Sequence, residues 1–189
     1  GGYVVNCSYP VVGNLADGTR VNTITSVLIQ TPVMKTTFGV STKEYDDKLR
    51  GNIDLTFYDD VTEEVAQFKS VMKLWDRLVL QKAQTEKKTW FRSSKVTNDI
   101  LSYLHNPMIR SNIRKSDGKV FADSFRAKIP RRSNKFTSEV FDADRTPVSL
   151  DAITPQCELR MLVRHTGIWF SETMFVSSFE APQLQKMND

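Results

Sequence analysis

Basic residues are concentrated in one segment of this sequence, and their density suggests contacts to phosphate groups. Between positions 110 and 135 the chain has nine basic residues and two acids, which is a local charge of +7. The whole chain has a formal net charge of +4, so the remaining residues together carry 4 − 7 = −3. Clustered cations suit a nucleic-acid backbone, because each cation neutralises a phosphate. The nine basic residues are Arg110, Arg114, Lys115, Lys119, Arg126, Lys128, Arg131, Arg132 and Lys135.

Apolar and basic residues alternate through residues 120–129, which is the pattern of a strand with two different faces. Arg126 and Lys128 fall on one face, and the other face is predicted to pack inward. With a loop before this strand and Arg131 and Arg132 after it, one hairpin would present a cationic stripe to a phosphate backbone. The alternative is a solvated surface whose cations pair with acids elsewhere in the chain. The residues on the predicted packed face are Phe121, Asp123, Phe125, Ala127 and Ile129.

A second basic patch surrounds two adjacent aromatic residues, Trp90 and Phe91. In a strand or loop, neighbouring side chains point to opposite sides, so one of the two rings is expected to face solvent. We predict that Trp90 is the most exposed of the three tryptophans and stacks on bases, which contributes about 1 to 3 kcal/mol per base. The alternative is that Trp90 packs in the core. The cations of this patch are Lys82, Lys87, Lys88, Arg92 and Lys95.

The sequence contains no arrangement of residues typical of catalysis or metal binding. Its two histidines, His105 and His165, lie 60 positions apart, and a structural role is expected for His165. The two cysteines, Cys7 and Cys157, lie 150 positions apart, which argues against a compact zinc site and a small disulfide scaffold. We therefore expect neither an enzyme, nor a cofactor, nor a bound metal.

Composition indicates one ordinary globular domain. The chain has 189 residues, of which 40% are hydrophobic and 25% are charged. It has no uninterrupted apolar stretch of the length that crosses a membrane, and no N-terminal secretory signal is recognisable. We therefore predict an intracellular protein that has no membrane partner.

The N-terminal part is rich in Val, Ile and Thr, and Arg20–Gln30 is predicted as a strand. Pro32 is expected to end regular pairing, because proline has no N–H to donate to a neighbouring strand. A polar connection would then run from Phe38 to an acidic turn at 46–47. Period-two alternation returns at Asn52–Tyr58, which predicts a half-buried strand.

The period of the apolar residues changes after Asp60 to steps of three and four. This stripe predicts a long helix with Asp60 as its N-cap and Glu63 closing a capping box. Trp75 lies on the stripe and is expected to be buried. A second helix is predicted over Lys95–Leu104, ending before Asn106-Pro107 because the residue before proline disfavours helical geometry. The stripe consists of Val61, Val65, Phe68, Met72, Trp75 and Val79.

Strand patterns resume after the two helices, at residues 120–129, 135–141, 158–165 and 167–179, the last as the continuation of a hairpin. The order is therefore strands, helices and strands, without the regular alternation that produces a parallel sheet. We predict a mainly β (α+β) fold, with an antiparallel sheet or a β-barrel that carries a helical insertion.

The segment from His165 to Glu180 contains Gly-Ile-Trp-Phe, a short turn and an aromatic-rich returning strand. This segment resembles the C-terminal part of the single-stranded-DNA-binding proteins of large DNA viruses that infect algae and amoebae. That family is an OB-fold group related to a phage single-stranded-DNA-binding protein. The resemblance covers most of the chain, because other pieces follow in a similar order. These pieces are Ile29-Gln30-Thr31-Pro32, Phe38-Gly39, the aromatic helix through Trp75, Asn106-Pro107 and Phe141-Asp142.

The resemblance implies a five-stranded OB-like antiparallel barrel, with residues 1–189 as a single domain and a helical insertion at about 60–105. It also implies that a grooved face follows one strand of DNA, with basic residues on phosphates and aromatic rings under bases. The predicted binding residues are the nine cations of positions 110–135 together with Lys87, Lys88, Trp90 and Arg92.

The predicted function is non-catalytic binding and protection of single-stranded DNA in replication, recombination or repair, with replication proteins as further partners. The alternative is an RNA-binding protein or a structural component of a nucleoprotein or virion. A third interpretation is a module that binds only other proteins. If the protein is viral, its predicted location is the host nucleus or cytoplasm.

Overall fold

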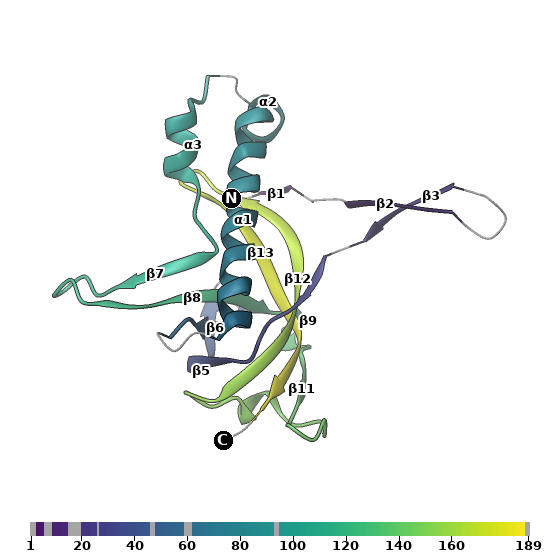
Figure 1. Cartoon of the computed structure of the whole chain (residues 1–189), viewed down its shortest axis with the longest axis vertical. Coiled ribbons are helices and arrows are strands. Elements are labelled where there is room, and N and C mark those ends of the chain that lie inside the picture. Colours follow the sequence, from purple (N-terminus) through teal and green to yellow (C-terminus); the bar gives the residue numbers. More distant parts are fainter. Residues whose placement is uncertain are drawn as a thin grey trace.

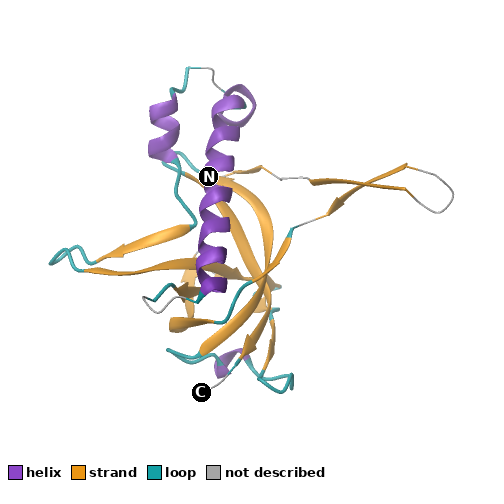
Figure 2. Ribbon diagram, in the orientation of Figure 1, coloured by secondary structure: helices purple, strands orange, loops and turns teal. Residues whose placement is uncertain are grey.

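Figure 1 shows the computed structural model of the chain, in which strands dominate and the α-helices stand along one side of them. Colouring by secondary structure shows the same division (Figure 2). Within the described residues, no helix is both long and apolar enough to span a membrane. The predictions for Cys7 and for the acidic pairs at 46–47 and 59–60 lie outside these residues. The structure describes residues 3–5, 9–14, 20–25, 27–45, 48–58, 62–92 and 95–187.

The elements are numbered in chain order, and the helices lie between strands β6 and β7. The strands before the helices are β1 (Tyr3–Val5), β2 (Tyr9–Asn14), β3 (Arg20–Thr25), β4 (Leu28–Gln30), β5 (Met34–Tyr45) and β6 (Lys48–Thr56). The helices are α1 (Glu63–Thr85), α2 (Lys87–Phe91) and α3 (Asn98–Leu104). The strands after them are β7 (Ile109–Ile113), β8 (Val120–Ile129), β9 (Arg131–Arg132), β10 (Lys135–Phe136), β11 (Glu139–Phe141), β12 (Glu158–Phe170) and β13 (Phe175–Lys186).

Five strands pair in a ring of order β5, β6, β8, β13 and β12, and β12 pairs with β5 again. Other strands extend this ring, because β1 and β4 pair with β12, β7 pairs with β8, and β11 pairs with β13. Strands β2 and β3 pair only with each other among the described pairings, as do β9 and β10.

Among the described strands two pairs are parallel, so the predicted antiparallel barrel is antiparallel only in part. Strand β13 runs parallel to β8, where Glu180 lies opposite Lys128, and β11 runs parallel to β13. A short turn makes the two strands that it joins antiparallel, as in the β12–β13 hairpin. Strands β8 and β13 are far apart in the sequence, so the connection between them allows the parallel direction.

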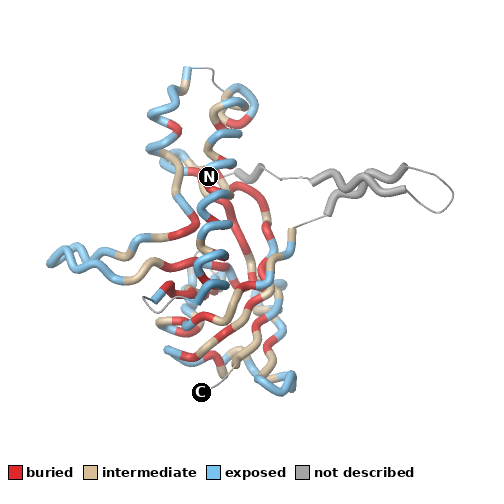
Figure 3. Tube along the Cα trace, in the orientation of Figure 1, coloured by how far each residue is buried: buried red, intermediate tan, exposed pale blue. Residues whose placement is uncertain are grey.

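Strand β8 confirms the predicted strand at 120–129, and its alternation from Phe125 to Ile129 is as expected. Arg126 and Lys128 face outward, and the alternating residues Phe125, Ala127 and Ile129 are buried. Figure 3 shows buried segments on the paired strands and exposed residues along the projecting end of the β7–β8 hairpin. The side chains of β6 and β8 that meet in the core are Ile53, Leu55, Phe125, Ala127 and Ile129.

An irregularity in the β7–β8 pairing changes the face on which β8 begins. Arg110 lies opposite Ser124 and Asn112 lies opposite Phe121, so β8 has one residue more than β7 between these pairs. The extra residue reverses the alternation of side chains. Phe121 therefore shares the outward face with Ser124 and is 45% exposed, which corrects the prediction that it packs in the core. Asp123 stays on the side of Phe125 that faces α1, where it is partly buried and forms an ion pair with Lys69 of α1 at 2.7 Å.

Helix α1 starts at a different cap from the one predicted. The N-cap is Thr62, whose hydroxyl accepts a hydrogen bond from the N–H of Val65 at 3.4 Å. The predicted Asp60 lies two positions earlier, outside the described residues. The apolar stripe is confirmed at Val65, Phe68, Met72 and Val79, which are buried. Trp75 is only partly buried, and Val61 lies outside the described residues.

A buried carboxylate of α1 holds the chain that leaves α3. Oδ2 of Asp76 accepts a hydrogen bond from the N–H of Met108 at 2.9 Å, and Oδ1 lies 3.5 Å from Nε2 of His105. Asp76 therefore ties the long helix to the entry of β7, the strand that leads to the basic segment.

Helix α3 begins at Asn98, three residues later than predicted, and ends at Leu104 as predicted.

Strand β5 occupies a segment for which the sequence predicted a polar connection. It pairs with β6 on both sides of an irregularity between Thr36 and Val40. Gly39 lies within this irregularity at φ +67°, in the left-handed region. A Cβ atom at Gly39 would lie 2.6 Å from the carbonyl oxygen of Ile153. The glycine lets β5 bend against this neighbouring backbone and continue, so Phe38-Gly39 does not end the strand.

Two predicted strands are each divided, and one is longer than predicted. The predicted strand at 20–30 forms β3 and β4, which pair with different partners. The predicted strand at 135–141 forms β10 and β11, because β10 pairs back with β9 whereas β11 pairs with β13. The predicted strand at 158–165 continues to Phe170 as β12 and joins β13 in the expected hairpin.

Candidate nucleic-acid interface

The outward faces of β6 and β8 carry polar and charged side chains opposite one another. Asn52 lies opposite Lys128, and Asp54 lies opposite Arg126. Ile53 and Ala127, which lie between these residues on the two strands, point into the core, so the four polar side chains share the outer face of the sheet. Arg110 of β7 joins the same face, since its partner Ser124 precedes Arg126 by two positions.

Arg126 is held in place by a two-point ion pair with Asp54. Its Nε and Nη2 atoms donate to the two carboxylate oxygens of Asp54 at 2.6 and 2.7 Å. This hydrogen bonding raises the pKa of Arg126. The guanidinium is therefore fixed in direction, and its charge is partly balanced by the neighbouring carboxylate.

Arg110 and Lys128 differ from Arg126, because the folded protein lowers the pKa of both side chains. Burial lowers the pKa of the Arg110 guanidinium, and the positive charge of Arg126 lowers it further, against the opposing effect of a nearby carboxylate. Burial also lowers the pKa of the Lys128 ammonium, with Arg50 adding to the effect and a carboxylate opposing it. Partly desolvated cations that repel one another are stabilised by an incoming anion. Both positions therefore suit a phosphate group.

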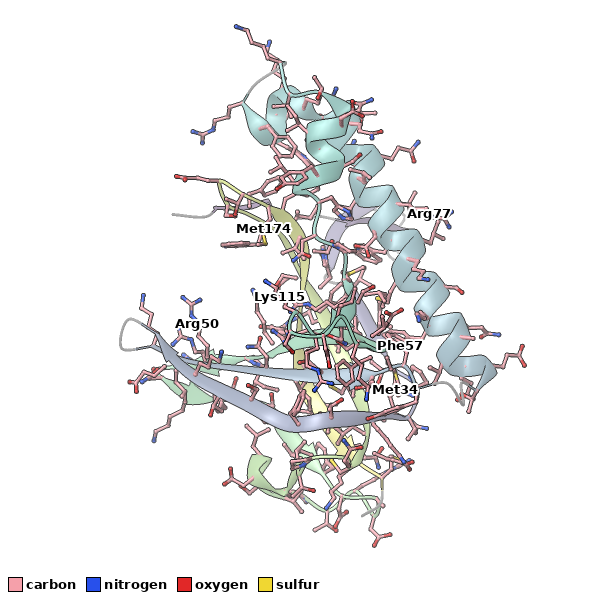
Figure 4. All side chains as sticks on the ribbon, turned by 90° about the vertical axis from the view of Figure 1, so that its left-hand side faces the viewer. Met34, Arg50, Phe57, Arg77, Lys115 and Met174 are labelled. Atoms are coloured by element: carbon pink, nitrogen blue, oxygen red, sulfur yellow. The ribbon has the colours of Figure 1, made fainter. Side chains whose placement is uncertain are left out.

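The far end of the β7–β8 hairpin carries an exposed aromatic ring between cations. Arg114 pairs with Asp117 at 2.9 Å, and its guanidinium lies 5.4 Å from the centre of the Phe121 ring. The Lys119 ammonium lies 5.5 Å from the same ring. Figure 4 labels Lys115 on this hairpin, which points toward the viewer. The hairpin end thus combines an accessible ring with three cations.

The other end of β8 leads into the β9–β10 ribbon, where Arg131, Arg132 and Lys135 are exposed. Oδ1 of Asn134 accepts a hydrogen bond from the N–H of Leu49 at 2.8 Å and another from Arg131 at 3.3 Å. These bonds hold the ribbon against the start of β6. The nine basic residues of positions 110–135 therefore lie on β8, beside it on β7 and at its two ends, and we refer to these nine as the cationic track.

Two further cations lie beside the cationic track and were not among the predicted site residues. Arg50 on β6 affects the pKa of Lys128, and Lys48 lines a small pocket together with Arg131. A signal was present in the sequence, because polar residues alternate from Lys48 through Arg50 and Asn52 into the predicted strand. The predicted strand began only at Asn52, so the two cations before it were missed.

The structure does not place the second basic patch beside the cationic track. Helix α2 carries Lys87, Lys88 and Trp90, and Arg92 follows it directly. Figures 1 and 4 show α2 near the C-terminal end of α1, away from strand β8. These four residues therefore do not share a face with the nine cations of the track.

Trp90 is buried, so the prediction that it is the most exposed tryptophan is wrong. It is 8% exposed, whereas Trp75 and Trp169 are both partly buried. Its ring packs edge-on against Phe170 at 5.8 Å between centroids, within a core cluster. The error came from the assumed backbone: in a helix, neighbouring side chains are about 100° apart, so Trp90 and Phe91 both reach the core.

The two histidines lie within packed parts of the structure. His165 is buried between Trp75 and Phe179, with ring centroids 5.0 Å from each. Burial lowers the pKa of His165 to about 4. This agrees with the structural role predicted for it. Among the described residues, no three His, Cys, Asp or Glu side chains are grouped so that they could hold a metal ion.

Solved structures of phage single-stranded DNA-binding proteins have a fold similar to that of this chain. The protein from bacteriophage Enc34 has a TM-score of 0.51 at 13% sequence identity, covering 86% of this chain and 81% of that one. Its complex with single-stranded DNA has a TM-score of 0.53 at 13% identity, covering 86% of each chain. Gp2.5 of bacteriophage T7 has a TM-score of 0.52 at 8% identity, covering 85% of this chain and 91% of that one. At these identities the likeness concerns the fold.

A family model matches residues 52–189, and its description is Family of unknown function (DUF5871). The matched residues include the helices, the whole cationic track and the β12–β13 hairpin. No curated protein matches this chain in sequence.

Proposed function

We propose that this chain, which belongs to the Family of unknown function (DUF5871), binds single-stranded DNA without catalysing a reaction. The observation that carries this proposal is the cationic track, in which Arg126 and Lys128 lie on β8, Arg110 lies beside them on β7, and the other six cations lie at the two ends of β8. The lowered pKa values of Arg110 and Lys128 support it, because an anion would relieve the repulsion between cations there. The fold is similar to that of a phage protein whose structure contains single-stranded DNA.

The pairing of the strands supports an OB-like barrel as the frame of this site. The five strands β5, β6, β8, β13 and β12 pair in a closed order, and an OB-like barrel also has five strands. We propose that residues 1–189 form a single such domain, with a helical insertion at about 60–105. In this frame, β6 and β8 supply the face over which the DNA backbone would pass.

The proposed binding mode combines phosphate contacts with base stacking. Arg110, Lys128 and the cations at both ends of β8 would contact successive phosphates. Phe121 takes the stacking role that the sequence assigned to Trp90, because its ring is exposed and lies among cations. Neither contact distinguishes one base from another, so the binding would be largely independent of sequence.

The biological setting is proposed from the resemblance and from the similar folds together. We propose a role in replication, recombination or repair, inside the cell, with replication proteins as further partners. Membership of the group of single-stranded-DNA-binding proteins from large DNA viruses of algae and amoebae stays a prediction.

The test of the proposed function is a titration of fluorescein-labelled oligothymidine at several salt concentrations. We expect the logarithm of the binding constant to fall linearly with the logarithm of salt, with a slope of about −0.7 for each phosphate contacted. Unlabelled RNA and duplex DNA are added as competitors. Weak competition by both supports a preference for single-stranded DNA, equal competition by RNA favours the RNA-binding alternative, and a binding constant that ignores salt contradicts the proposal.

Phe121→Ala is expected to weaken binding of oligothymidine by about 1 to 3 kcal/mol, because the mutation removes one stacking ring. The salt slope should stay the same, since no charge is lost. The matched control is Tyr103→Ala on α3, a ring that is 87% exposed but remote from the cationic track, and it should bind normally. If Phe121→Ala binds like the unmodified protein, Phe121 is not the stacking residue.

A further inference from the structure

A second cavity rich in positive charge lies on the outer surface of the β12–β13 hairpin. It has a volume of about 270 Å³ and opens between β4, β11, β12, β13 and the turn after β11. Two arginines, Arg145 and Arg160, line it together with glutamines and the ring of Phe141, and no carboxylate lines it. A pocket with two guanidinium groups and no acid is suited to an anion.

Arg160 enters this cavity with a hydrogen-bonding group that has no partner among the described residues. Its Nε atom is buried and makes no hydrogen bond. The glutamine amides beside it are already directed elsewhere, because Gln183 donates to Glu139 at 2.6 Å and Gln185 donates to the carbonyl of Asp142 at 3.3 Å. A buried donor without an acceptor is rare in folded proteins, and an anion in the cavity would supply one.

Arg145 reaches the cavity from a backbone conformation that an L-residue seldom adopts. Its φ is +64°, and the turn that holds it is closed by bonds from the N–H of Arg145 to the Asp142 carbonyl (3.1 Å) and from the N–H of Thr146 to Oδ1 of Asp142 (2.8 Å). Glycine or asparagine is the usual residue at such a position. Such conformations are enriched at ligand sites, so the position of Arg145 at the cavity is consistent with a binding role.

The outer surface between the cationic track and this cavity is continuous across two strands. Lys128 of β8 lies opposite Glu180 of β13, and Glu180 lies opposite Arg164 of β12, with which it forms an ion pair. Arg160 and Arg164 both face outward on β12, because Met161 and Val163, which alternate with them, are buried. A strand of DNA that leaves Lys128 could therefore cross β13 and arrive at the cavity.

We propose that Arg145 and Arg160 bind a phosphodiester group of the same DNA strand, beyond the cationic track. This proposal rests on the proposed function and extends it, because it predicts that a long oligonucleotide gains a contact that a short one cannot reach. A phosphodiester suits the cavity, since its two free oxygens can accept from two guanidinium groups, one from β12 and one from the turn after β11.

The variants for the test are Arg145→Gly, Arg160→Met and the two combined. Arg145→Gly removes the charge and also relieves the left-handed strain, so its melting temperature should not fall. Methionine at 160 keeps an unbranched apolar chain along the cavity wall. The matched control is Arg77→Met, which removes one exposed cation from α1, on the opposite side from Arg50 in Figure 4.

Binding is measured by fluorescence anisotropy with oligothymidines of about 8 and about 30 nucleotides, one within and one beyond the roughly 4 to 16 nucleotides that an OB fold covers. We expect the double variant to bind the long oligonucleotide about tenfold more weakly and with a salt slope reduced by about 0.7, because one phosphate contact is lost. Binding of the short oligonucleotide should be unchanged, and Arg77→Met should bind both normally.

Three results would overturn this inference. Normal binding of the long oligonucleotide by the double variant would remove the cavity from the DNA path. Equal losses on both oligonucleotides would show that the cavity does not extend the footprint. Loss of binding to labelled poly-glutamate, with DNA binding intact, would assign the cavity to an acidic protein partner. Failure of the unmodified protein to bind either oligonucleotide would instead contradict the proposed function.

Discussion

Replacing Arg110 and Lys128 together by methionine is expected to weaken binding of single-stranded DNA by about 100-fold at low salt. Each residue would contribute one phosphate contact, and the loss of such a contact costs about 1.4 kcal/mol, or tenfold in affinity. The salt slope should become less steep by about 1.4, because two fewer counterions are released. Anisotropy titrations with labelled oligothymidine measure both quantities.

The reason for choosing these two cations is their electrostatic environment. The folded protein lowers the pKa of both, so their charged forms are disfavoured before DNA arrives. Methionine keeps the apolar part of each side chain and removes the repulsion from Arg126 and Arg50. The double variant should therefore fold at least as stably as the unmodified protein, and a loss of affinity can be attributed to the lost contacts.

The control for this prediction removes the same charge from another surface. Lys73 and Arg77 are exposed on α1, and they line a pocket on the helix side of the sheet together with Asp76 and Asp123. The variant Lys73→Met/Arg77→Met has the same net charge as the test variant and should lose little affinity. If the two double variants weaken binding equally, net charge and not the cationic track determines the affinity.

Trp90→Ala is expected to lower the free energy of unfolding by about 3 to 5 kcal/mol. The ring is almost fully buried against Phe170, in a cluster that includes Leu101 and Phe175. Removing it leaves a cavity between the helices and the end of the β12–β13 hairpin, which the surrounding residues fill only partly. Chemical denaturation followed by circular dichroism measures the change.

Two comparisons separate this core role from the binding role first predicted for Trp90. Trp90→Phe keeps most of the buried ring and should recover more than half of the lost stability. Under conditions in which Trp90→Ala is still folded, it should bind oligothymidine normally. A variant that stays fully stable but loses DNA affinity would restore the stacking role that the sequence predicted.

The sequence predicted the central strand of the basic segment, but not the strand that pairs with it. Its strand at 120–129 and the outward direction of Arg126 and Lys128 follow from alternation, which reports burial one residue at a time. Arg110 was expected in a loop, however, and the structure places it on β7. Only pairing with β8 makes that segment a strand, and pairing depends on residues that are distant in the sequence.

The aromatic residues show where local patterns stop being informative. Trp90 and Phe121 both lie next to lysines and arginines in the sequence, and one became a core residue while the other became exposed. Nothing within a few positions of either residue determines this outcome. The short helix α2 turns Trp90 inward, and one extra residue in the β7–β8 pairing turns Phe121 outward.

The sequence by itself determined where positive charge is concentrated, that the chain is mainly β with helices in the middle, and which residues of β8 alternate. These properties depend on residue type and on short-range periodicity, so they can be read along the chain. The tertiary structure alone decided which ring is accessible, that Arg50 lies beside Lys128, and that Arg145 and Arg160 share a cavity. These relations arise from strand register and from packing between segments that are distant in the sequence. A local pattern of residue types does not determine which distant segments pack together.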